Sequence, residues 1–446
     1  MDGPLALRTE ATDVFSRKPP CQSPAEMINA RTDPLIAAVA MKIGIYVQTW
    51  HVGGVAAFSE RLAVGLNDLR HSPCLVLSTP YGKRDPAGRC SYDTLLRSGG
   101  CPIVCLHLNV FHPKERAWRA ADAIAALELD VLFLSAHGPL AEAWARLCPG
   151  TPLIGIAHND DEDTYAEFKA TEAFCDAYVA VSTAILSKLE GLAQSAPQTR
   201  RVHIPYGVPI QPVVSEGPCS AEARVLAVCR LDQRQKRVLD LPVIWSQYRR
   251  GGGKATLSIC GTGPEERRLE QAFADEVESG GVKILGAIPL DRMPEIYAQH
   301  DLLISVSAYE GLPLSVLEAA THGLWLLLSN TRSGHPEIVE TLSAGCLCGV
   351  GDVGAFAAAL RQATDDLQHI RGLRRGIQTT ARTRFGLERM VGDYADLGQH
   401  VLARRVAQGS PLPTRQSPVT RPRADFVRRF IRKWQYSRHY GWRDYD

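Results

Sequence analysis

Short runs of aliphatic and β-branched residues alternate with longer segments of helical periodicity from residue 41 onward. The pattern begins abruptly with the buried-strand sequence Met41-Lys-Ile-Gly-Ile-Tyr-Val. Strands that alternate with helices in this way predict parallel sheets covered by helices on both faces. Residues 1–40 contain several prolines and lack sustained periodicity, so we expect a flexible extension there, with Met41 as an alternative start.

The predicted strands fall into two series, separated by a polar, proline-containing connection between Val202 and Ala221. The first series consists of Lys42–Val47, Cys74–Ser78, Val131–Ser135, Leu153–Ala157 and Tyr178–Val181. The second consists of Arg224–Cys229, Ala255–Cys260, Val282–Leu285, Leu302–Ser305 and Trp325–Leu328. This pattern predicts an α/β fold of two Rossmann-like domains, residues 41–210 and 211–405, facing across a cleft, with a linker and tail at 406–446. Ligands of open parallel sheets bind at the carboxyl ends of the strands, so the loops that follow strands are the candidate sites.

Length and composition narrow the class of protein. A chain of 446 residues is too long for one ordinary core, which favours two domains of roughly 150–200 residues. The net charge of +2 gives no whole-molecule field that would attract nucleic acid. Twelve cysteines without a Cys-x-x-Cys pair argue for reduced, mostly buried thiols rather than zinc sites or disulfides. No apolar run approaches the roughly 18–20 residues of a spanning helix and no signal pattern opens the chain, so we expect a cytoplasmic protein.

Two glycine-rich loops follow predicted strands. Gly53 and Gly54 come after the first strand, and Gly261-Thr-Gly263-Pro264 comes after a strand of the second series. Glycines let the backbone approach a ligand, and the amides that open the next helix favour an anion. Pro264 suits the first position of that helix. The alternative for each loop is a plain tight turn, because such motifs are weak evidence alone.

Charged residues follow two strands of the second series. Arg230 and Lys236 share one loop, where two cations can neutralise a diphosphate without a metal; otherwise they are solvated surface charges. Glu310 lies in the loop after Leu302–Ser305, and Pro313 can start a helix that carries Glu318 in its second turn. Carboxylates in these positions can accept hydrogen bonds from the vicinal hydroxyls of a sugar or a ribose. The alternative is one acid at a helix N-terminus and one exposed acid.

Together these motifs resemble a known family. Their order and spacing are similar to those of the retaining nucleotide-sugar glycosyltransferases of family 4, which have the GT-B fold. The matching residues are Gly53-Gly54, His158, Arg230 with Lys236, Gly261-x-Gly263, and Glu310-Gly-Leu-Pro-Leu-Ser-Val-Leu-Glu318. The resemblance covers roughly residues 41–400. Tyr206 departs from it, since it replaces the usual Asn of a Pro-Asn-Gly connection, and so does Thr321-His-Gly-Leu-Trp, where a small residue and Pro are common.

The resemblance implies a role for each matching residue. Arg230 and Lys236 would hold the donor diphosphate and stabilise charge as the nucleoside diphosphate leaves. Glu310 would position the transferred sugar, and Glu318 would bind the ribose hydroxyls. His158 would line the sugar site. The donor would also contact the two glycine loops and the residues that follow Glu310, namely Gly53, Gly54, Gly261, Gly263, Gly311, Leu312, Pro313 and Leu314.

The resulting prediction is a retaining hexosyltransferase of polysaccharide or glycoconjugate biosynthesis. The donor would be a UDP- or GDP-sugar, the acceptor a saccharide or a lipid-linked saccharide, and no metal or other cofactor would be required. One alternative is a nucleotide-sugar epimerase on the same fold, which would act without an acceptor. Another is a non-catalytic scaffold subunit that binds sugar nucleotides, against which the intact charged residues argue.

Two further segments carry hypotheses of their own. Asp161-Glu-Asp163 spells Asp-x-Asp, a metal-binding signature of another glycosyltransferase fold, but so short a motif recurs by chance and a solvated loop is the favoured interpretation. In residues 424–440, Phe426, Phe430 and Trp434 share one helical face, opposite a basic face. This pattern predicts peripheral contact with the inner face of the membrane, the alternative being docking onto a protein surface.

Overall fold

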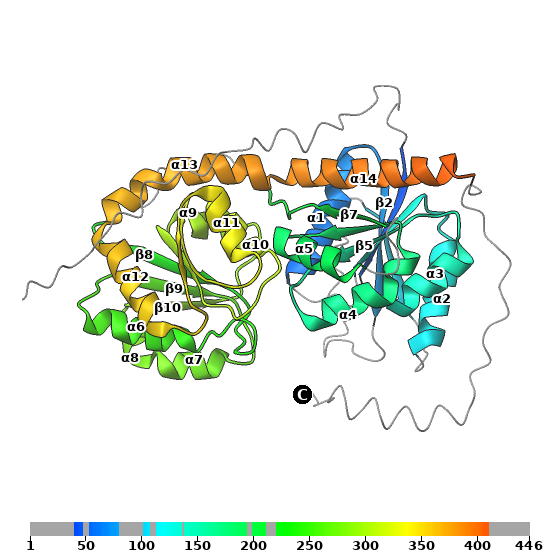
Figure 1. Ribbon diagram of the computed structural model, residues 1–446. Helices are drawn as coiled ribbons and strands as arrows, with labels where there is room; N and C mark the ends of the chain where they lie inside the picture. Colours follow the sequence, from blue (N-terminus) through cyan, green and yellow to red (C-terminus); the bar gives the residue numbers. More distant parts are fainter. Residues whose placement is uncertain are drawn as a thin grey trace, which may run out of the picture. The chain divides into compact units, whose positions relative to one another are not determined.

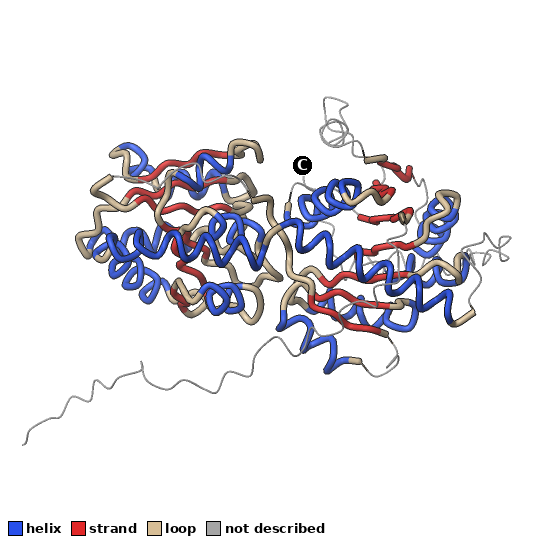
Figure 2. The backbone as a smooth tube through the Cα atoms, turned by 90° about the horizontal axis from the view of Figure 1, so that it is seen from above, coloured by secondary structure: helices blue, strands red, loops and turns tan. Residues whose placement is uncertain are grey.

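The predicted α/β architecture is confirmed by a computed structural model that describes residues 40–47, 53–79, 101–107, 113–135, 138–193, 199–210 and 220–409 (Figure 1). Within these segments the chain forms a seven-stranded and a six-stranded sheet. All the strand pairings are parallel. Figure 2 shows the strands of each sheet side by side. The extension at residues 1–39 and the basic amphipathic segment at 424–440 lie outside the described residues.

The N-terminal sheet has the strand order β3-β2-β1-β4-β5-β6-β7. Its strands are β1 (Lys42–Val47), β2 (Ser72–Thr79), β3 (Ile103–His107), β4 (Val131–Ser135), β5 (Leu153–Ala157), β6 (Ala177–Ala180) and β7 (Arg200–His203). Its helices are α1 (Gly54–Asp68), α2 (Pro113–Ala125), α3 (Gly138–Leu147), α4 (Glu162–Thr171) and α5 (Thr183–Leu192). Every residue of β4, β5 and β6 is buried, as expected for strands covered on both faces.

The C-terminal sheet has the order β10-β9-β8-β11-β12-β13. Its strands are β8 (Arg224–Val228), β9 (Thr256–Cys260), β10 (Val282–Gly286), β11 (Leu302–Ser305), β12 (Trp325–Ser329) and β13 (Cys346–Cys348). Its helices are α6 (Asp240–Arg250), α7 (Glu266–Ala272), α8 (Ala274–Glu278), α9 (Met293–Ala298), α10 (Leu314–Thr321), α11 (His335–Leu342) and α12 (Val353–Asp365). In Figure 1, α6, α7 and α12 cover one face of the sheet and α10 and α11 the other.

The strand order places a topological switch point in each sheet. In the C-terminal sheet the chain moves outward from β8 to β10 and then returns, so that β11 pairs with the other side of β8. The loops at the carboxyl ends of β8 and β11 therefore diverge around one point, which is where ligands bind in open α/β sheets. The corresponding point in the N-terminal sheet lies between β1 and β4.

Two long helices complete the described chain. α13 (Leu367–Phe385) contacts α10 and α11 of the C-terminal domain, whereas α14 (Leu387–Ala407) contacts α1 of the N-terminal domain. The sequence assigned α14 to the C-terminal domain, but its packing partner is α1, where a Cβ on Gly65 would lie 2.4 Å from Val391. Both sheets belong to one compact unit. None of the helices in the described segments combines the length and apolar character needed to cross a membrane.

Asp301 immediately precedes β11, and its side chain is fully buried. Its carboxylate accepts hydrogen bonds from the backbone N–H of Arg224 at 3.0 Å and from Arg371 Nε on α13 at 2.8 Å. Removing one partner of a buried ion pair leaves an uncompensated charge, so Asp301→Ala should lower the unfolding free energy by about 3–5 kcal/mol in urea denaturation.

The matched control is Asp365→Ala, which removes the exposed partner of Arg361 one helical turn away. Exposed pairs of this kind contribute up to about 1 kcal/mol. Equal losses for the two variants would show that Asp301 does not anchor β8, β11 and α13.

Candidate active site

The switch point of the C-terminal sheet brings together two of the predicted site residues. Lys236, from the loop after β8, donates to Glu310 Oε1 from the loop after β11, and the two atoms are 2.6 Å apart. The loops are also joined by a backbone hydrogen bond of 2.7 Å from Ala308 to Gln235. The Glu310 side chain is only 6% exposed, so this carboxylate depends on Lys236 for its neutralisation.

The electrostatic environment keeps both partners charged. Burial alone raises the pKa of Glu310, but Lys236, with smaller contributions from His335 and Ser307, holds that pKa below its usual value of 4.5. Burial alone lowers the pKa of Lys236, but Glu310 keeps it above its usual value of 10.5. Glu310 is therefore an ionised hydrogen-bond acceptor at neutral pH and not a proton donor.

Arg230 lies on the same loop as Lys236, but its side chain is largely exposed and pairs with Asp232 instead of Glu310. Its side chain is 61% exposed, and its Nη2 lies 2.5 Å from Asp232 Oδ2. Burial raises the pKa of Asp232, but the backbone N–H of Gln235 and the guanidinium of Arg230 lower it below its usual value. Asp232 thus tethers an exposed guanidinium at the carboxyl end of β8, where it can meet an anion.

Glu318 is held by two residues that sequence reasoning missed. Its Oε1 accepts from Arg61 Nη2 of α1 at 2.5 Å, and its Oε2 accepts from the hydroxyl of Tyr297 at 2.9 Å. Burial, followed by the nearby Glu318 carboxylate, raises the pKa of Tyr297, which therefore keeps its proton and donates. One signal for Arg61 existed in the sequence: it lies seven positions after Gly54, about two turns along the same helix face.

His158 follows β5 and meets the second domain through its backbone. A Cβ on Gly311 would lie 1.8 Å from the His158 carbonyl oxygen, so only glycine fits there. The imidazole is buried, with Nδ1 2.5 Å from the hydroxyl of Tyr206 and Nε2 2.9 Å from Ser135 Oγ. Burial lowers the pKa of His158 to about 3, so the ring is neutral at physiological pH. Tyr206, the departure from the family pattern, is thus the hydrogen-bond partner of this histidine.

The residues that follow Gly311 form the start of α10. Pro313 occupies the N-cap position in an extended conformation, and no side chain caps the helix. Leu312 and Leu314 are both buried in the hydrophobic core. The Gly311 carbonyl accepts from Ser333 Oγ at 2.9 Å, which fixes the turn. The uncapped amides at this helix start remain suited to anionic oxygens.

The two glycine loops differ in how strongly the protein itself requires glycine. A Cβ on Gly54 would meet no atom of the described residues within 4 Å, and Gly53, the N-cap of α1, is extended. Gly261 has a φ of +135° and a Cβ there would lie 1.8 Å from the Cys229 carbonyl oxygen. Packing among the described residues therefore explains Gly261 but not Gly54. Residues 48–52, which precede Gly53, lie outside the described residues.

The Gly261 loop contains a second glycine that packing requires, and its turn delays the start of α7. A Cβ on Gly263 would lie 2.3 Å from the Leu231 carbonyl oxygen, so this glycine is also required by packing. The prediction that Pro264 opens the next helix is wrong, since α7 begins at Glu266. The backbone N–H of Glu265 donates to the Leu231 carbonyl at 3.0 Å, and this turn delays the start of the helix.

Asp160 and Asp161, which follow β5, make hydrogen bonds within the local structure. Asp161 caps α4 by accepting from the backbone N–H of Thr164 at 2.8 Å. Asp160 accepts from Tyr165 at 2.5 Å and pairs with Arg332 at 3.4 Å. Across the segments that the structure describes, no group of three or more His, Cys, Asp or Glu side chains is placed to hold a metal ion.

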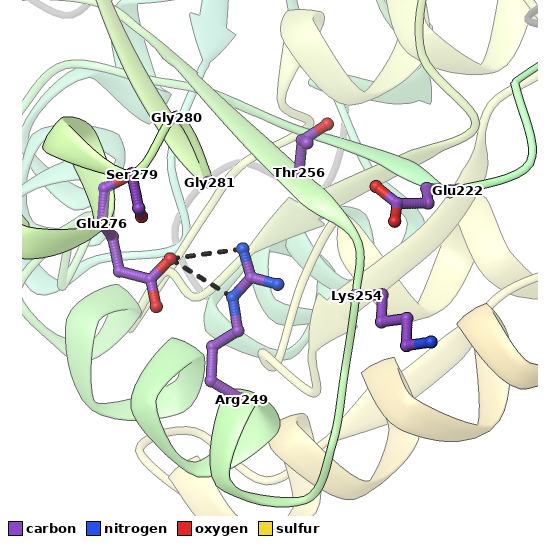
Figure 3. Close-up of a pocket in the computed structure, with 8 residues that line it drawn as sticks. All are labelled: Glu222, Arg249, Lys254, Thr256, Glu276, Ser279, Gly280 and Gly281. Atoms are coloured by element: carbon purple, nitrogen blue, oxygen red, sulfur yellow. Dashed lines mark hydrogen bonds and ion pairs between the residues drawn. The ribbon is translucent and has the colours of Figure 1, made fainter.

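A surface pocket lies at the other end of the C-terminal sheet (Figure 3). It is lined by residues at the amino ends of the strands, among them Glu222 before β8 and Thr256 at the start of β9. Arg249 on its wall is already paired with Glu276 at 3.2 Å. This pocket is therefore separate from the loops at the carboxyl ends of β8 and β11.

Solved structures with the same architecture define the class of fold. Sucrose-phosphate synthase from Thermosynechococcus elongatus aligns with a TM-score of 0.65 at 16% identity, covering 82% of this chain and 100% of that one. Anabaena HepE in complex with UDP and glucose aligns with a TM-score of 0.63 at 17% identity, covering 81% and 100%. The fold is the GT-B fold of two Rossmann-like domains.

Sequence comparisons then identify the family. Residues 52–211 match the family described as Glycosyltransferase Family 4, and residues 222–366 match Glycosyl transferases group 1. The amylovoran biosynthesis glycosyltransferase AmsK of Erwinia amylovora is 33% identical over 144 residues, which are 31% of this chain and 35% of AmsK. The chain thus spans about a third of that relative's length. It belongs to the family 4-like glycosyltransferases of the GT-B fold, as the sequence motifs predicted.

The glycine geometry predicts different effects of one substitution at two positions. Gly261→Ala should lower the melting temperature, because the added Cβ clashes with backbone and φ is in a region that alanine avoids. Gly54→Ala should leave the melting temperature nearly unchanged, because Gly54 is the first residue of α1 and the added Cβ would meet none of the described atoms within 4 Å. Calorimetry checks both, and a loss of stability in Gly54→Ala would contradict the open space at that position.

The Lys236–Glu310 pair predicts a pH dependence. A carboxyl whose pKa is lowered on folding stabilises the native state above its unfolded pKa, and this stability is lost as pH falls through the folded value. The loss of unfolding free energy in Glu310→Gln, relative to wild type, should therefore be constant between about pH 7 and 9 and shrink below pH 4.5. His335 is electrostatically coupled to Glu310 and has a pKa below its usual value of 6.5, so its titration does not cancel in this difference and sets the lower limit of the constant range. Urea denaturation of both proteins across pH provides the measurement, and a loss that persists at low pH would contradict the ion pair.

Proposed function

We propose that the chain is a retaining glycosyltransferase that moves a hexose from a UDP- or GDP-sugar to a saccharide or lipid-linked acceptor, without a metal. The observation that carries this proposal is the arrangement at the C-terminal switch point. An exposed guanidinium, Arg230, lies on the same loop as Lys236, which is paired with the buried Glu310. Such a set of cations can bind a diphosphate, and an ionised carboxylate can accept hydrogen bonds from the hydroxyls of a sugar ring.

The charges of the site support a division of roles. Arg230, Lys236 and the uncapped amides of α10 would neutralise the donor diphosphate, which is why no metal is needed. Glu310 would accept hydrogen bonds from hydroxyls of the transferred sugar, since its low pKa makes it an acceptor. Gly54, which has no Cβ and no close contact with other described side chains, would let the α1 backbone approach the phosphates.

We propose front-side displacement as the mechanism. The bond between the anomeric carbon and the β-phosphate oxygen breaks, and its electron pair stays on that oxygen. The acceptor hydroxyl forms the new bond on the same face and passes its proton to the leaving phosphate. Arg230 and Lys236 stabilise the charge that develops on the phosphate, so the product retains the anomeric configuration.

His158 has a supporting place in this proposal. Its neutral ring, held between Tyr206 and Ser135, keeps the preceding strand end against Gly311. A direct contact of the imidazole with the transferred sugar stays a prediction, and it requires one of these two hydrogen bonds to be exchanged for a sugar hydroxyl.

Two relatives support the substrate class. AmsK is described as a glycosyltransferase of amylovoran biosynthesis, and HepE was solved with UDP and glucose. On this basis we place the proposed reaction in polysaccharide or glycoconjugate assembly, with a nucleoside diphosphate as leaving group.

The main functional prediction is that Arg230→Ala lowers sugar transfer by at least about 100-fold, as loss of a charge-stabilising donor does in other enzymes. The fold should be intact, because the Arg230 side chain is largely exposed. Glu310→Gln and Lys236→Met should abolish transfer as well. Thermal-shift screening of UDP- and GDP-sugars identifies the donor, and release of nucleoside diphosphate measures turnover.

The matched control is Arg268→Ala. Arg268 is 66% exposed and pairs with Glu265 at 2.8 Å, much as Arg230 pairs with Asp232, but it lies on α7. It should transfer sugar like the wild type. Near-normal turnover in Arg230→Ala, Glu310→Gln and Lys236→Met together would refute the proposed function, and conversion of the donor without release of nucleoside diphosphate would indicate an epimerase.

A further inference from the structure

A cation from the N-terminal domain reaches the second glutamate of the site. Arg61 projects from α1 and pairs with Glu318 of α10, with the two side chains only 15% and 16% exposed. The other terminal nitrogen of Arg61, Nη1, is buried and has no hydrogen-bond partner among the described residues. The same carboxylate also accepts from Tyr297, which is 1% exposed.

Packing alone does not account for this arrangement. Burying an ion pair carries a desolvation penalty, and an unsatisfied buried N–H adds a further unfavourable free energy. Buried polar groups are normally paired, so an unpaired guanidinium nitrogen beside a carboxylate needs an explanation. A ligand oxygen that binds there would satisfy it.

Glu318 also has unused acceptor capacity. An ionised carboxylate offers about four lone-pair positions. Arg61 occupies one on Oε1 and Tyr297 one on Oε2, so one position remains on each oxygen. Two adjacent hydroxyl donors, as on a ribose, match these two positions without displacing either protein partner.

We propose that Arg61 is a positioning residue for the ribose of the donor nucleotide. With Tyr297 it holds Glu318 in the orientation that accepts both ribose hydroxyls, and its free Nη1 donates to a ribose oxygen. The N-terminal domain therefore takes part in nucleotide recognition by the C-terminal domain. This inference rests on the proposed function, because it assumes that a nucleoside diphosphate binds at this site.

The test measures discrimination for ribose. Dissociation constants are determined calorimetrically for UDP and GDP and for their 2′,3′-dideoxy counterparts. Wild type should bind its preferred ribonucleotide at least about tenfold more tightly than the dideoxy form. In Arg61→Met this ratio should fall below about twofold, since the carboxylate loses its partner and the guanidinium is gone. The double variant Arg61→Met/Glu318→Gln should bind no more weakly than Glu318→Gln, because coupled residues are not additive.

A second contact between the domains provides the control. Glu337 of α11 accepts from the backbone N–H and the hydroxyl of Thr183 on α5, each at 2.8 Å. Glu337→Gln weakens this contact but should leave the ribose ratio unchanged. If Arg61→Met does not fold, Arg61→Lys is used, which keeps the charge but loses the two-nitrogen fork and should give a reduced ratio.

The outcomes separate the two proposals. An undiminished ribose ratio in the folded Arg61 variant overturns this inference and leaves the proposed function standing. An equal drop of the ratio in Glu337→Gln also overturns it, since the effect would then come from domain contact in general. Wild type that binds neither UDP nor GDP refutes the proposed function and this inference with it.

Discussion

Strands that are buried on both faces leave no room for charge, and this constraint decides where the chemistry of the protein can lie. The buried strand β11 has a carboxylate near each end: Asp301 precedes it and Glu310 follows it. At the amino end, the Asp301 carboxylate accepts hydrogen bonds from Arg371 and from the backbone N–H of Arg224. At the carboxyl end, Glu310 has Lys236, and Arg230 nearby remains exposed. The same type of ion pair thus joins structural elements at one end of β11 and lies in the candidate site at the other.

Several contacts between the two domains are made by or beside the loops that carry the candidate site. Gly311 lies against the His158 carbonyl, Ser182 Oγ is 2.7 Å from Ser333 Oγ, and Arg61 reaches Glu318. Candidate binding residues and residues that join the domains therefore alternate over a short stretch of chain. A substitution in these loops affects both properties, which is why stability and binding have to be measured separately for each variant.

The sequence predicted those features of the fold that depend on local residue patterns, but not those that depend on contacts between distant segments. Buried strands such as β1, β4 and β5 were predicted with their correct bounds, because their apolar runs are continuous. The edge strand β7, which reads Arg-Arg-Val-His, and the three-residue β13 were missed because polar or very short strands carry a weak pattern. The edge strand β3, Ile-Val-Cys-Leu-His, was also missed, although it is as long as β4 and β5. The positions of Glu310, Glu318, Arg230 and Lys236 after their strands followed from the same local pattern.

The partners of those residues could not be predicted. The role of Lys236 beside Arg230 at a diphosphate stays a prediction, but its ion pair with Glu310 was not predicted; it forms where the loops after β8 and β11 are joined by the backbone hydrogen bond from Ala308 to Gln235. Arg61 and Glu318 are 257 positions apart, so only the packing of α1 near α10 brings them together. His158 matched a motif, yet motif spacing carries no information about the burial of its ring.

Glu310 and Glu318, which are eight positions apart, differ in which domain supplies the paired cation. Glu310 is paired with Lys236 of its own domain, so this ion pair requires only the folded C-terminal domain. Glu318 takes its cation from the other domain and is fully partnered only when α1 lies against α10. Because Lys236 is engaged by Glu310, Arg230 has the more exposed charge of the two loop cations, and in the proposed reaction it would provide most of the stabilisation of negative charge on the leaving phosphate. Both glutamates are paired with cations, which is consistent with the proposed recognition of hydroxyl groups by their carboxylates.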